Sequence, residues 1–372
     1  MGGITLQDLH IMIKPVSSNC NMKCKYCFYH DLAENRQVAS YGVMEEELLE
    51  LIVNKAFSEA DISVNFSFQG GEPTLAGLAF YKKLIDYINK YNRDNISVNL
   101  ALQTNGLIID DNWAKFLSDN DFLVGLSIDG YKSLHNYFRI DRDNEGTYNR
   151  VIKTSQLFKK HSVEFNVLTV ITDQLARHIR KVYKDYKKRE FKYLQFIRCL
   201  DSLEGENNNY ILFPGKYKTF LNNLFNEWYK DIKEGNYISI RFFDNIVGML
   251  MGRNPEACEM KGNCSFQNII EADGSIYPCD FYVTDRWNLG NIKNMSFLEV
   301  YQNEKAQNFI KQSIDFPDKC KECKWVNLCR NGCRRNRDDD NLNVYCEVFY
   351  GFFEKNFEKL IEINEHFKTI NS

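Results

Sequence analysis

Residues 20–27 read Cys-Asn-Met-Lys-Cys-Lys-Tyr-Cys, so Cys20, Cys24 and Cys27 form a C-x3-C-x2-C triplet. Thiolates are the usual protein ligands of iron–sulfur clusters, and three of them so close together can wrap one face of a [4Fe–4S] cubane. The fourth iron then lacks a protein ligand and can bind a small molecule through an amine and a carboxylate. The alternatives are a zinc knuckle without its fourth ligand and three inert buried thiols.

The chain around this triplet alternates strand-like and helix-like segments. Runs rich in β-branched and aromatic residues predict strands at Leu9–Val16, Ile62–Phe68, Ser97–Gln103, Phe122–Ile128, Val163–Ile171 and Tyr193–Ile197. Helical periodicity fills the intervals, at Glu45–Glu59, Ala79–Tyr91, Asp111–Ser118, Tyr148–His161 and Ala176–Arg189. This alternation is typical of parallel βαβ units, and six of them fall short of a closed eight-fold barrel. We therefore expect an α/β fold, a partial (β/α)6 barrel over residues 1–235, whose last part is an amphipathic helix at Lys216–Lys230.

The amino-acid composition and the periodicity of the chain change after about residue 236. Cysteine, glycine and asparagine become frequent there, and regular periodicity fades until a helical pattern returns near Glu347. We expect a loop-rich metal-binding domain over residues 236–346 and a C-terminal helix over residues 347–372.

The bulk composition narrows the function classes. A formal net charge of −3 argues against nucleic-acid binding through a general basic field. Residues 1–10 do not resemble a signal peptide, and no apolar run approaches the about 20 residues that span a bilayer. We expect a cytoplasmic protein with neither membrane nor nucleic-acid partners. In a reducing compartment, clustered cysteines usually bind metal or do redox chemistry.

Cysteines are also clustered in the second half of the chain, at Cys258, Cys264, Cys279, Cys320, Cys323, Cys329, Cys333 and Cys346. Eight thiolates suit two fully ligated [4Fe–4S] clusters, and two structural zinc sites of four cysteines each are the alternative. The twelfth cysteine, Cys199, follows the last predicted strand of the barrel. We interpret it as a small buried side chain and assign it no role.

The triplet, with the aromatic Tyr26 before its third cysteine, resembles the radical S-adenosylmethionine (SAM) superfamily. The string from Cys264 through Gly274 to Cys346 resembles the SPASM extension of its peptide-modifying members. The resemblance implies three [4Fe–4S] clusters, with SAM at the open iron of the first. It also implies interleaved ligands: auxiliary cluster I would use Cys258, Cys264, Cys279 and Cys333, and auxiliary cluster II would use Cys320, Cys323, Cys329 and Cys346.

The superfamily resemblance also implies a SAM pocket. Gly70 and Gly71 follow the second predicted strand and let the backbone approach a ligand, while the carboxylate of Glu72 or a carbonyl nearby can take the SAM ammonium. Without this context, the run Gln69-Gly-Gly-Glu-Pro73 is a plain turn. The other residues implied to contact SAM are Tyr26, Ser127, Asp129, Arg139 and Leu200. Ser127 and Asp129 end a parallel strand, Arg139 can pair with a carboxylate, and Leu200 can pack on adenine.

Several longer runs resemble the anaerobic sulfatase-maturating enzymes, radical SAM/SPASM dehydrogenases that make Cα-formylglycine. These runs are Ile13–Cys20, Cys24–His30, Phe68–Gly77, Leu102–Gly106, Phe122–Ser127 and Tyr277–Tyr282. The family implies that a 5′-deoxyadenosyl radical removes a Cβ hydrogen from the cysteine or serine of a sulfatase Cys/Ser-x-Pro-x-Arg segment. It implies Asp280 as the base, Tyr29 and Gln69 in the substrate channel, and a low-potential electron donor such as ferredoxin or flavodoxin.

Two other interpretations remain open at this point. SPASM enzymes also crosslink or epimerise ribosomal peptides, although many of those enzymes carry an additional N-terminal peptide-recognition domain. The other alternative is a non-enzymatic zinc-ribbon scaffold, which the triplet and the Gly-Gly-Glu loop argue against.

Overall fold

The computed structural model describes residues 6–203 and 210–371, and these residues form two compact units. The first unit contains the chain up to Ser127 together with residues 136–165 and 265–309. The second contains residues 128–135, 166–264 and those from 310 onward. Both units are therefore built from segments that are distant in sequence. The domain bounds expected at residues 235 and 346 remain predictions.

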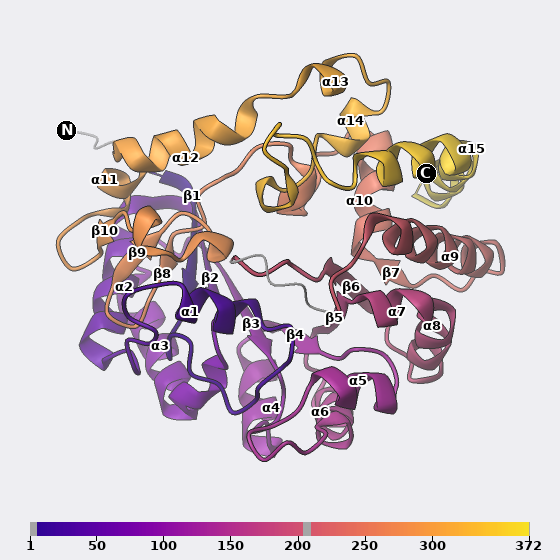
Figure 1. The fold of residues 1–372 in the computed structure, drawn as a ribbon. Helices are drawn as coiled ribbons and strands as arrows, with labels where there is room; N and C mark the ends of the chain where they lie inside the picture. The colour runs from indigo at the N-terminus through magenta and orange to yellow at the C-terminus, as the bar shows by residue number, and fades with distance from the viewer. Residues whose placement is uncertain (1–5, 204–209, 372) are drawn as a thin grey trace. The chain divides into compact units, whose positions relative to one another are not determined.

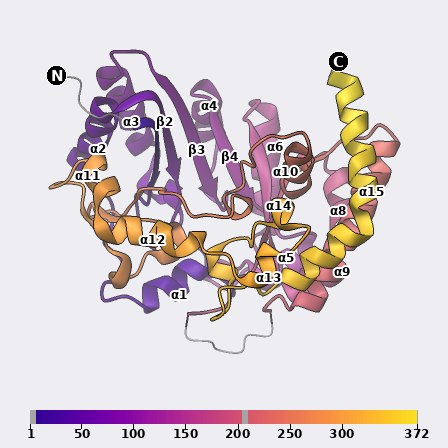
Figure 2. The ribbon, with the colours of Figure 1, turned by 90° about the horizontal axis from the view of Figure 1, so that it is seen from above.

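The first unit is built on a sheet with the strand order β10-β9-β8-β1-β2-β3-β4. Its strands are β1 (Leu6–Ile13), β2 (Ala60–Phe68), β3 (Ser97–Thr104), β4 (Phe122–Ser127), β8 (Ile269–Ile270), β9 (Ser275–Tyr277) and β10 (Gly290–Asn291). The pairs from β8 to β4 are parallel, and β9 pairs antiparallel with β8 and β10. Figure 2 shows β2, β3 and β4 running in the same direction.

Helices pack on this sheet because the strands and the helices each carry one apolar face. In β1 the buried residues are Leu9, Ile11 and Ile13, at the spacing of two that places side chains on one face of a strand. The helices of this unit are α1 (Phe28–Glu34), α2 (Glu46–Glu59), α3 (Leu78–Tyr91), α4 (Asp111–Asp119), α6 (Tyr148–Lys160) and α11 (Phe297–Gln302) (Figure 1). Short 3-10 turns lie at Pro73–Ala76, Asp280–Tyr282 and Asp285–Trp287.

Three neighbouring parallel strands end level with one another. Ile13 of β1 is the register partner of both Phe68 of β2 and Ile270 of β8. The next residues along the chain, Lys14, Gln69 and Glu271, therefore form a row at the carboxyl edge of the sheet. In open parallel sheets this edge is where ligands bind.

The second unit contains the parallel strands β5 (Phe165–Ile171), β6 (Tyr193–Arg198) and β7 (Ser239–Ile240). Its helices are α7 (Asp173–Arg177), α8 (Ile179–Lys188), α9 (Pro214–Lys233), α10 (Arg241–Leu250), α13 (Asp318–Lys321), α14 (Val326–Cys329) and α15 (Cys346–Asn371), with 3-10 turns at Cys258–Met260 and Arg334–Asn336. Two of the boundaries between the units fall within the helices α5 (Lys132–Phe138) and α12 (Glu304–Ile314).

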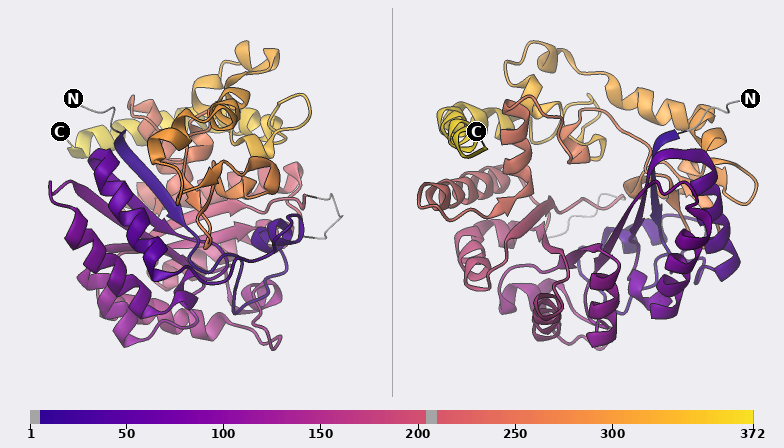
Figure 3. Two further views of the ribbon diagram at one scale, coloured as in Figure 1. Left: turned by 90° about the vertical axis from the view of Figure 1, so that its left-hand side faces the viewer. Right: turned by 180° about the vertical axis from the view of Figure 1, so that it is seen from behind.

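Aromatic side chains fasten α15 to α9 and α10, and α9 and α15 lie side by side in Figure 3. The ring of Phe225 is 5.3 Å from that of Phe352, and Trp228 is 4.9 Å from Phe243. Full burial of one such side chain contributes about 1.5–3 kcal/mol.

The secondary structure agrees with the sequence in most of the predicted elements, although helices α1 and α5 are not among them. Three further differences have a local explanation or concern the second half of the chain. The first strand ends at Ile13 and not at Val16, since Pro15 has no amide hydrogen to donate. The helix expected at Ala176–Arg189 is wrong as one element, because α7 begins at Asp173 after the cap Thr172 and ends at Arg177, and α8 begins at Ile179. Residues 236–346, expected to be loop-rich, also carry helices α10, α11 and α12. Among residues 6–203 and 210–371, no helix has the length and apolarity that crossing a bilayer requires.

Candidate active site

The cysteine triplet lies in the loop between β1 and α1, and Cys27 is the residue before the first turn of α1. The sulfur of Cys20 accepts hydrogen bonds from the amide of Met22 (3.3 Å) and from Asn105 Nδ2 (3.7 Å). Arg142 Nε donates to the carbonyl of Cys20 over 2.8 Å. Donors directed at a thiolate sulfur suit a cluster ligand, since hydrogen bonds to sulfur stabilise its charge.

The loop that bears Cys20 is held against the Gly-Gly-Glu turn after β2. The amide of Gly71 donates to the carbonyl of Ser17 over 2.9 Å, and the amide of Glu72 donates to that of Asn19 over 2.8 Å. Gly70 has φ +115°, and a Cβ there would lie 2.7 Å from the carbonyl oxygen of Ser17. Only glycine fits such a close approach of two backbones.

Replacing Gly71 with alanine is expected to displace the backbone that carries Cys20, because the new Cβ would overlap the carbonyl of Asn19. Overpacking of this kind costs about 1–3 kcal/mol. We expect a lower unfolding temperature and loss of the iron bound by the triplet, measured by calorimetry and iron analysis. Gly215→Ala is the matched control, since no atom lies within 4 Å of a Cβ at that position in α9. Normal iron content in Gly71→Ala would show that the turn does not hold the triplet.

Glu72 is buried and both of its carboxylate oxygens are engaged within the first unit. Oε1 accepts from Thr74 Oγ1 (2.5 Å) and Thr104 Oγ1 (2.7 Å), and Oε2 accepts from the amide of Asn105 (2.7 Å). This arrangement directs Asn105 toward Cys20. Of the two acceptors expected for the SAM ammonium, the geometry therefore favours a backbone carbonyl of the turn over the Glu72 carboxylate.

The remaining residues expected to contact SAM occur in both units. In the first unit, the Arg139 guanidinium lies 5.6 Å from the Tyr26 ring, and Ser127 Oγ accepts from Gln103 Nε2 over 3.0 Å. In the second unit, Asp129 is buried and its Oδ1 accepts from the amide of Val170 over 3.0 Å. Leu200 is partly exposed just after β6. Their contacts with SAM remain proposals.

Asp280 meets Tyr29 and Gln69 in the first unit. The Tyr29 hydroxyl lies 2.6 Å from Asp280 Oδ2 and 3.2 Å from Gln69 Oε1. The contact forms because α1 packs on β8 and β9 through a buried cluster that contains Leu32, Ile269, Tyr277 and Val283. Tyr29 thus contacts both of the other residues that the sequence assigns to catalysis and the substrate channel.

The Asp280 carboxyl group is buried, and its Oδ1 has no hydrogen-bond partner among the described residues. Burial raises the pKa of Asp280, although the ammonium of Lys14, 4.0 Å from Oδ1, and the Tyr29 hydroxyl oppose the change. Burial and the neighbouring carboxylate also raise the pKa of Tyr29. Its hydroxyl therefore stays protonated and donates a hydrogen bond to Asp280. A buried acceptor with one open oxygen is suited to taking a proton from a substrate.

In the second unit, the thiols of Cys320, Cys323, Cys329 and Cys346 lie close enough to affect one another's ionisation. Cys258, Cys264 and Cys333 form a second such group, whereas the fourth ligand expected for auxiliary cluster I, Cys279, belongs to the first unit. Burial raises the pKa of Cys329 and of Cys333 to about 12. Thiols of this kind become thiolates when a metal binds them.

The donor sets fit iron–sulfur clusters in their chemistry. Each of the two groups in the second unit consists of thiols, and thiolates are the usual protein ligands of such clusters.

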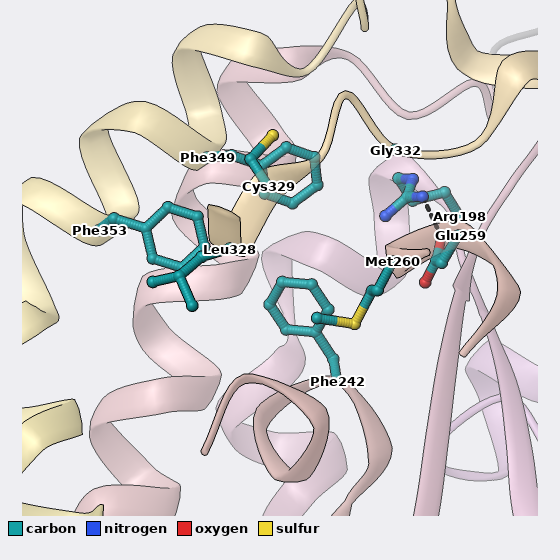
Figure 4. Close-up of a pocket in the computed structure, with 9 residues that line it drawn as sticks. All are labelled: Arg198, Phe242, Glu259, Met260, Leu328, Cys329, Gly332, Phe349 and Phe353. Atoms are coloured by element: carbon teal, nitrogen blue, oxygen red, sulfur yellow. Dashed lines mark hydrogen bonds and ion pairs between the residues drawn. The ribbon is translucent and has the colours of Figure 1, made fainter. Parts of the chain in front are cut away.

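Figure 4 shows a pocket in the second unit whose lining includes one of these cysteines and residues next to two others in the chain. Cys329 lines it, and Glu259, which pairs there with the buried Arg198, directly follows Cys258. The Arg198 guanidinium also lies 5.4 Å from the rings of Tyr217 and Tyr345. A buried cation needs such partners, because its desolvation otherwise costs several kcal/mol.

Four polar residues near the expected site residues are not predicted from the sequence: Lys14, Arg36, Asn105 and Glu271. Lys14 and Glu271 each directly follow an apolar strand end, at Ile13 and Ile270, and a charged residue in that position is the signal that could have revealed them.

Comparison with known proteins identifies the family. Residues 15–186 match the model of the Radical SAM superfamily, and residues 258–324 match SPASM, an iron–sulfur cluster-binding domain. A cysteine-type anaerobic sulfatase-maturating enzyme of Clostridium perfringens is 49% identical over 370 residues, which cover 98% of this chain and 100% of that protein. The chain belongs to the anaerobic sulfatase-maturating enzymes.

Relatives of this sulfatase-maturating enzyme include a serine-type member from Bacteroides thetaiotaomicron, 31% identical over 372 residues, which cover 94% of this chain and 89% of that protein. The solved structure of native anSMEcpe with bound AdoMet and Kp18Cys peptide is 48% identical, with a TM-score of 0.93 and coverage of 96% and 99%. These matches confirm the predicted radical SAM fold with a SPASM extension, the iron–sulfur chemistry and the enzymatic function. The zinc-ribbon scaffold is thereby ruled out.

Proposed function

We propose that the enzyme oxidises the active-site cysteine of a sulfatase to Cα-formylglycine, with Asp280 as the base. The observation that carries the proposal is the 2.6 Å contact between the Tyr29 hydroxyl and Asp280 Oδ2, which holds a buried carboxylate directly after the cluster ligand Cys279. Cysteine is proposed over serine because the cysteine-type relative is 49% identical and the serine-type relative 31%.

A cluster held by Cys20, Cys24 and Cys27, with SAM bound to it, would supply the 5′-deoxyadenosyl radical that removes a hydrogen atom from the substrate Cβ, and an auxiliary cluster would accept the one electron left over. The residues of this chain accept the proton that the substrate releases. Asp280 accepts it from the substrate thiol at Oδ1, while Tyr29 keeps the carboxylate in place through Oδ2. Loss of the hydrogen atom, the proton and the electron converts the cysteine side chain into a thioaldehyde, which water hydrolyses to the aldehyde with release of hydrogen sulfide.

The other expected residues bind and orient. Gln69 and Tyr29 line the substrate channel, since Gln69 follows the end of β2 and Tyr29 of α1 contacts both Gln69 and Asp280. Gly70 and Gly71 open backbone space for SAM, and Tyr26, Ser127 and Arg139 of the same unit are further proposed contacts. For Asp129 and Leu200 of the second unit, the proposed contact with SAM rests on the resemblance to the family. Low-potential ferredoxin or flavodoxin provides the electron. The cytoplasm is the proposed location, because cluster ligands have to be reduced thiols.

The test is anaerobic turnover with matched peptides. The purified enzyme, with clusters reconstituted, is reduced in the presence of SAM and a peptide that bears Cys-x-Pro-x-Arg or Ser-x-Pro-x-Arg. Mass spectrometry follows the peptide and 5′-deoxyadenosine. We expect an aldehyde on the cysteine peptide and a lower rate on the serine peptide.

Two other outcomes are informative. Faster conversion of the serine peptide would overturn the cysteine preference alone. Formation of 5′-deoxyadenosine with both peptides unchanged would overturn the sulfatase substrate and favour a maturase of another peptide.

A further inference from the structure

Asp280 belongs to a cluster of four charged side chains in the first unit. The other three, Lys14, Arg36 and Glu271, have no role in the proposed proton transfer. Lys14 Nζ lies 3.1 Å from Glu271 Oε1 and 4.0 Å from Asp280 Oδ1. Arg36 Nη1 lies 2.6 Å from the same oxygen of Glu271. All four are buried, with Lys14 only 2% exposed. Two positive and two negative charges thus balance inside the protein.

The register of the sheet places this cluster. Lys14 and Glu271 follow the paired ends of β1 and β8, and the amide of Lys14 donates to the carbonyl of Ile270 over 2.8 Å. Arg36 Nη2 also donates to Ser17 Oγ and to the carbonyl of Ala39, so the guanidinium is held in place by three partners. The position of Lys14 therefore depends on rigid strand ends and not on a flexible loop.

The ammonium of Lys14 contacts both members of the Tyr29–Asp280 pair. It lies 4.9 Å from the centre of the Tyr29 ring, which is within the range of a cation–π interaction. At 4.0 Å from Asp280 Oδ1 it attracts the carboxylate but is too far away for a hydrogen bond. Oδ1 is consequently oriented by charge while its lone pairs stay open.

We propose that Lys14 is a positioning residue for catalysis, which holds Asp280 with Oδ1 open to the substrate while Glu271 and Arg36 keep the ammonium from moving onto that oxygen. This inference rests on the proposed role of Asp280 as the base. Glu271 draws Lys14 to 3.1 Å, and its closer bond to Arg36 limits how far that carboxylate can move. Loss of the Lys14 charge frees the Asp280 carboxylate to rotate.

The decisive variant is Lys14→Met, which keeps the length of the side chain and removes its charge. Glu271 remains paired with Arg36 in this variant, so no carboxylate of that pair is left without a cation. Small misplacement of a catalytic group can cost about 100-fold in rate. We call the amount of formylglycine formed per 5′-deoxyadenosine the coupling ratio. We expect this ratio to fall about 10- to 100-fold, with the Michaelis constant for the peptide and the iron content unchanged.

Two further variants keep the result interpretable. Lys14→Arg retains the charge and is expected to recover part of the coupling ratio. Lys55→Met removes another partly buried lysine of the first unit, which donates to the carbonyls of Ile292 and Met295 over 2.6 and 2.8 Å. Lys55→Met is expected to lower the unfolding temperature and to leave the coupling ratio as in the wild type.

The outcomes separate this inference from the proposed function. A wild-type enzyme that converts neither peptide overturns the proposed function. A wild-type enzyme that converts the cysteine peptide, with a Lys14→Met variant that couples equally well, overturns the positioning role alone. Equal losses of 5′-deoxyadenosine and product in Lys14→Met and in Lys14→Arg, with iron lost, would show that Lys14 acts only in folding.

Discussion

Replacing Asp280 with asparagine is expected to lower formylglycine formation about 10²- to 10⁴-fold, the range that a general base contributes. Asparagine has nearly the same shape, and its carbonyl oxygen can still accept the hydrogen bond of Tyr29 that Oδ2 accepts over 2.6 Å. It cannot take up a proton. Formation of 5′-deoxyadenosine should therefore continue near the wild-type rate. Liquid chromatography with mass spectrometry measures both 5′-deoxyadenosine and the formylglycine peptide.

Asp285→Asn is the matched control for this experiment. Asp285 lies in the next 3-10 turn, is exposed, and accepts the amide of Gln37 over 2.9 Å, so the change alters the same segment without touching Tyr29. We expect wild-type turnover from it. If Asp280→Asn lost 5′-deoxyadenosine formation as well as the aldehyde, Asp280 would be needed for the cluster loop and not for proton transfer.

Replacing Cys24 with alanine is expected to abolish both products. With two thiolates left in the loop before α1, the cluster that binds SAM cannot be held, since the open iron requires the other three to be anchored. We expect the loss of about four irons per chain. Iron and sulfide analysis of the reconstituted variant, together with the assay for 5′-deoxyadenosine, measures the effect.

Cys199→Ala provides the comparison within the same chain. Cys199 is buried at the end of β6 and lies outside all three proposed ligand sets. Its replacement should leave the iron content and both products unchanged. A loss of iron from Cys199→Ala equal to that from Cys24→Ala would contradict the ligand sets proposed here.

The elements that the sequence predicted well share a strong local signal. The strands Ser97–Thr104 and Phe122–Ser127 and the helix Glu46–Glu59 repeat apolar residues at the spacing of their own geometry. The helices α10 and α12 were missed because glycine, asparagine and cysteine are frequent over residues 236–346 as a whole, which favours the prediction of loops. The break at His178 was missed because the apolar pattern continues through it.

The sequence by itself predicted the cluster ligands, because three cysteines within eight residues can wrap one face of a cubane, and these ligands stay predictions. It also determined the family, through runs that span most of the chain. The tertiary structure alone decided which side chains meet at Asp280. Tyr29 is 251 positions away from it, and Lys14 reaches it only because β1 pairs with β8 in a register that ends both strands together. Strand register is a property of two segments, so neither segment encodes it alone.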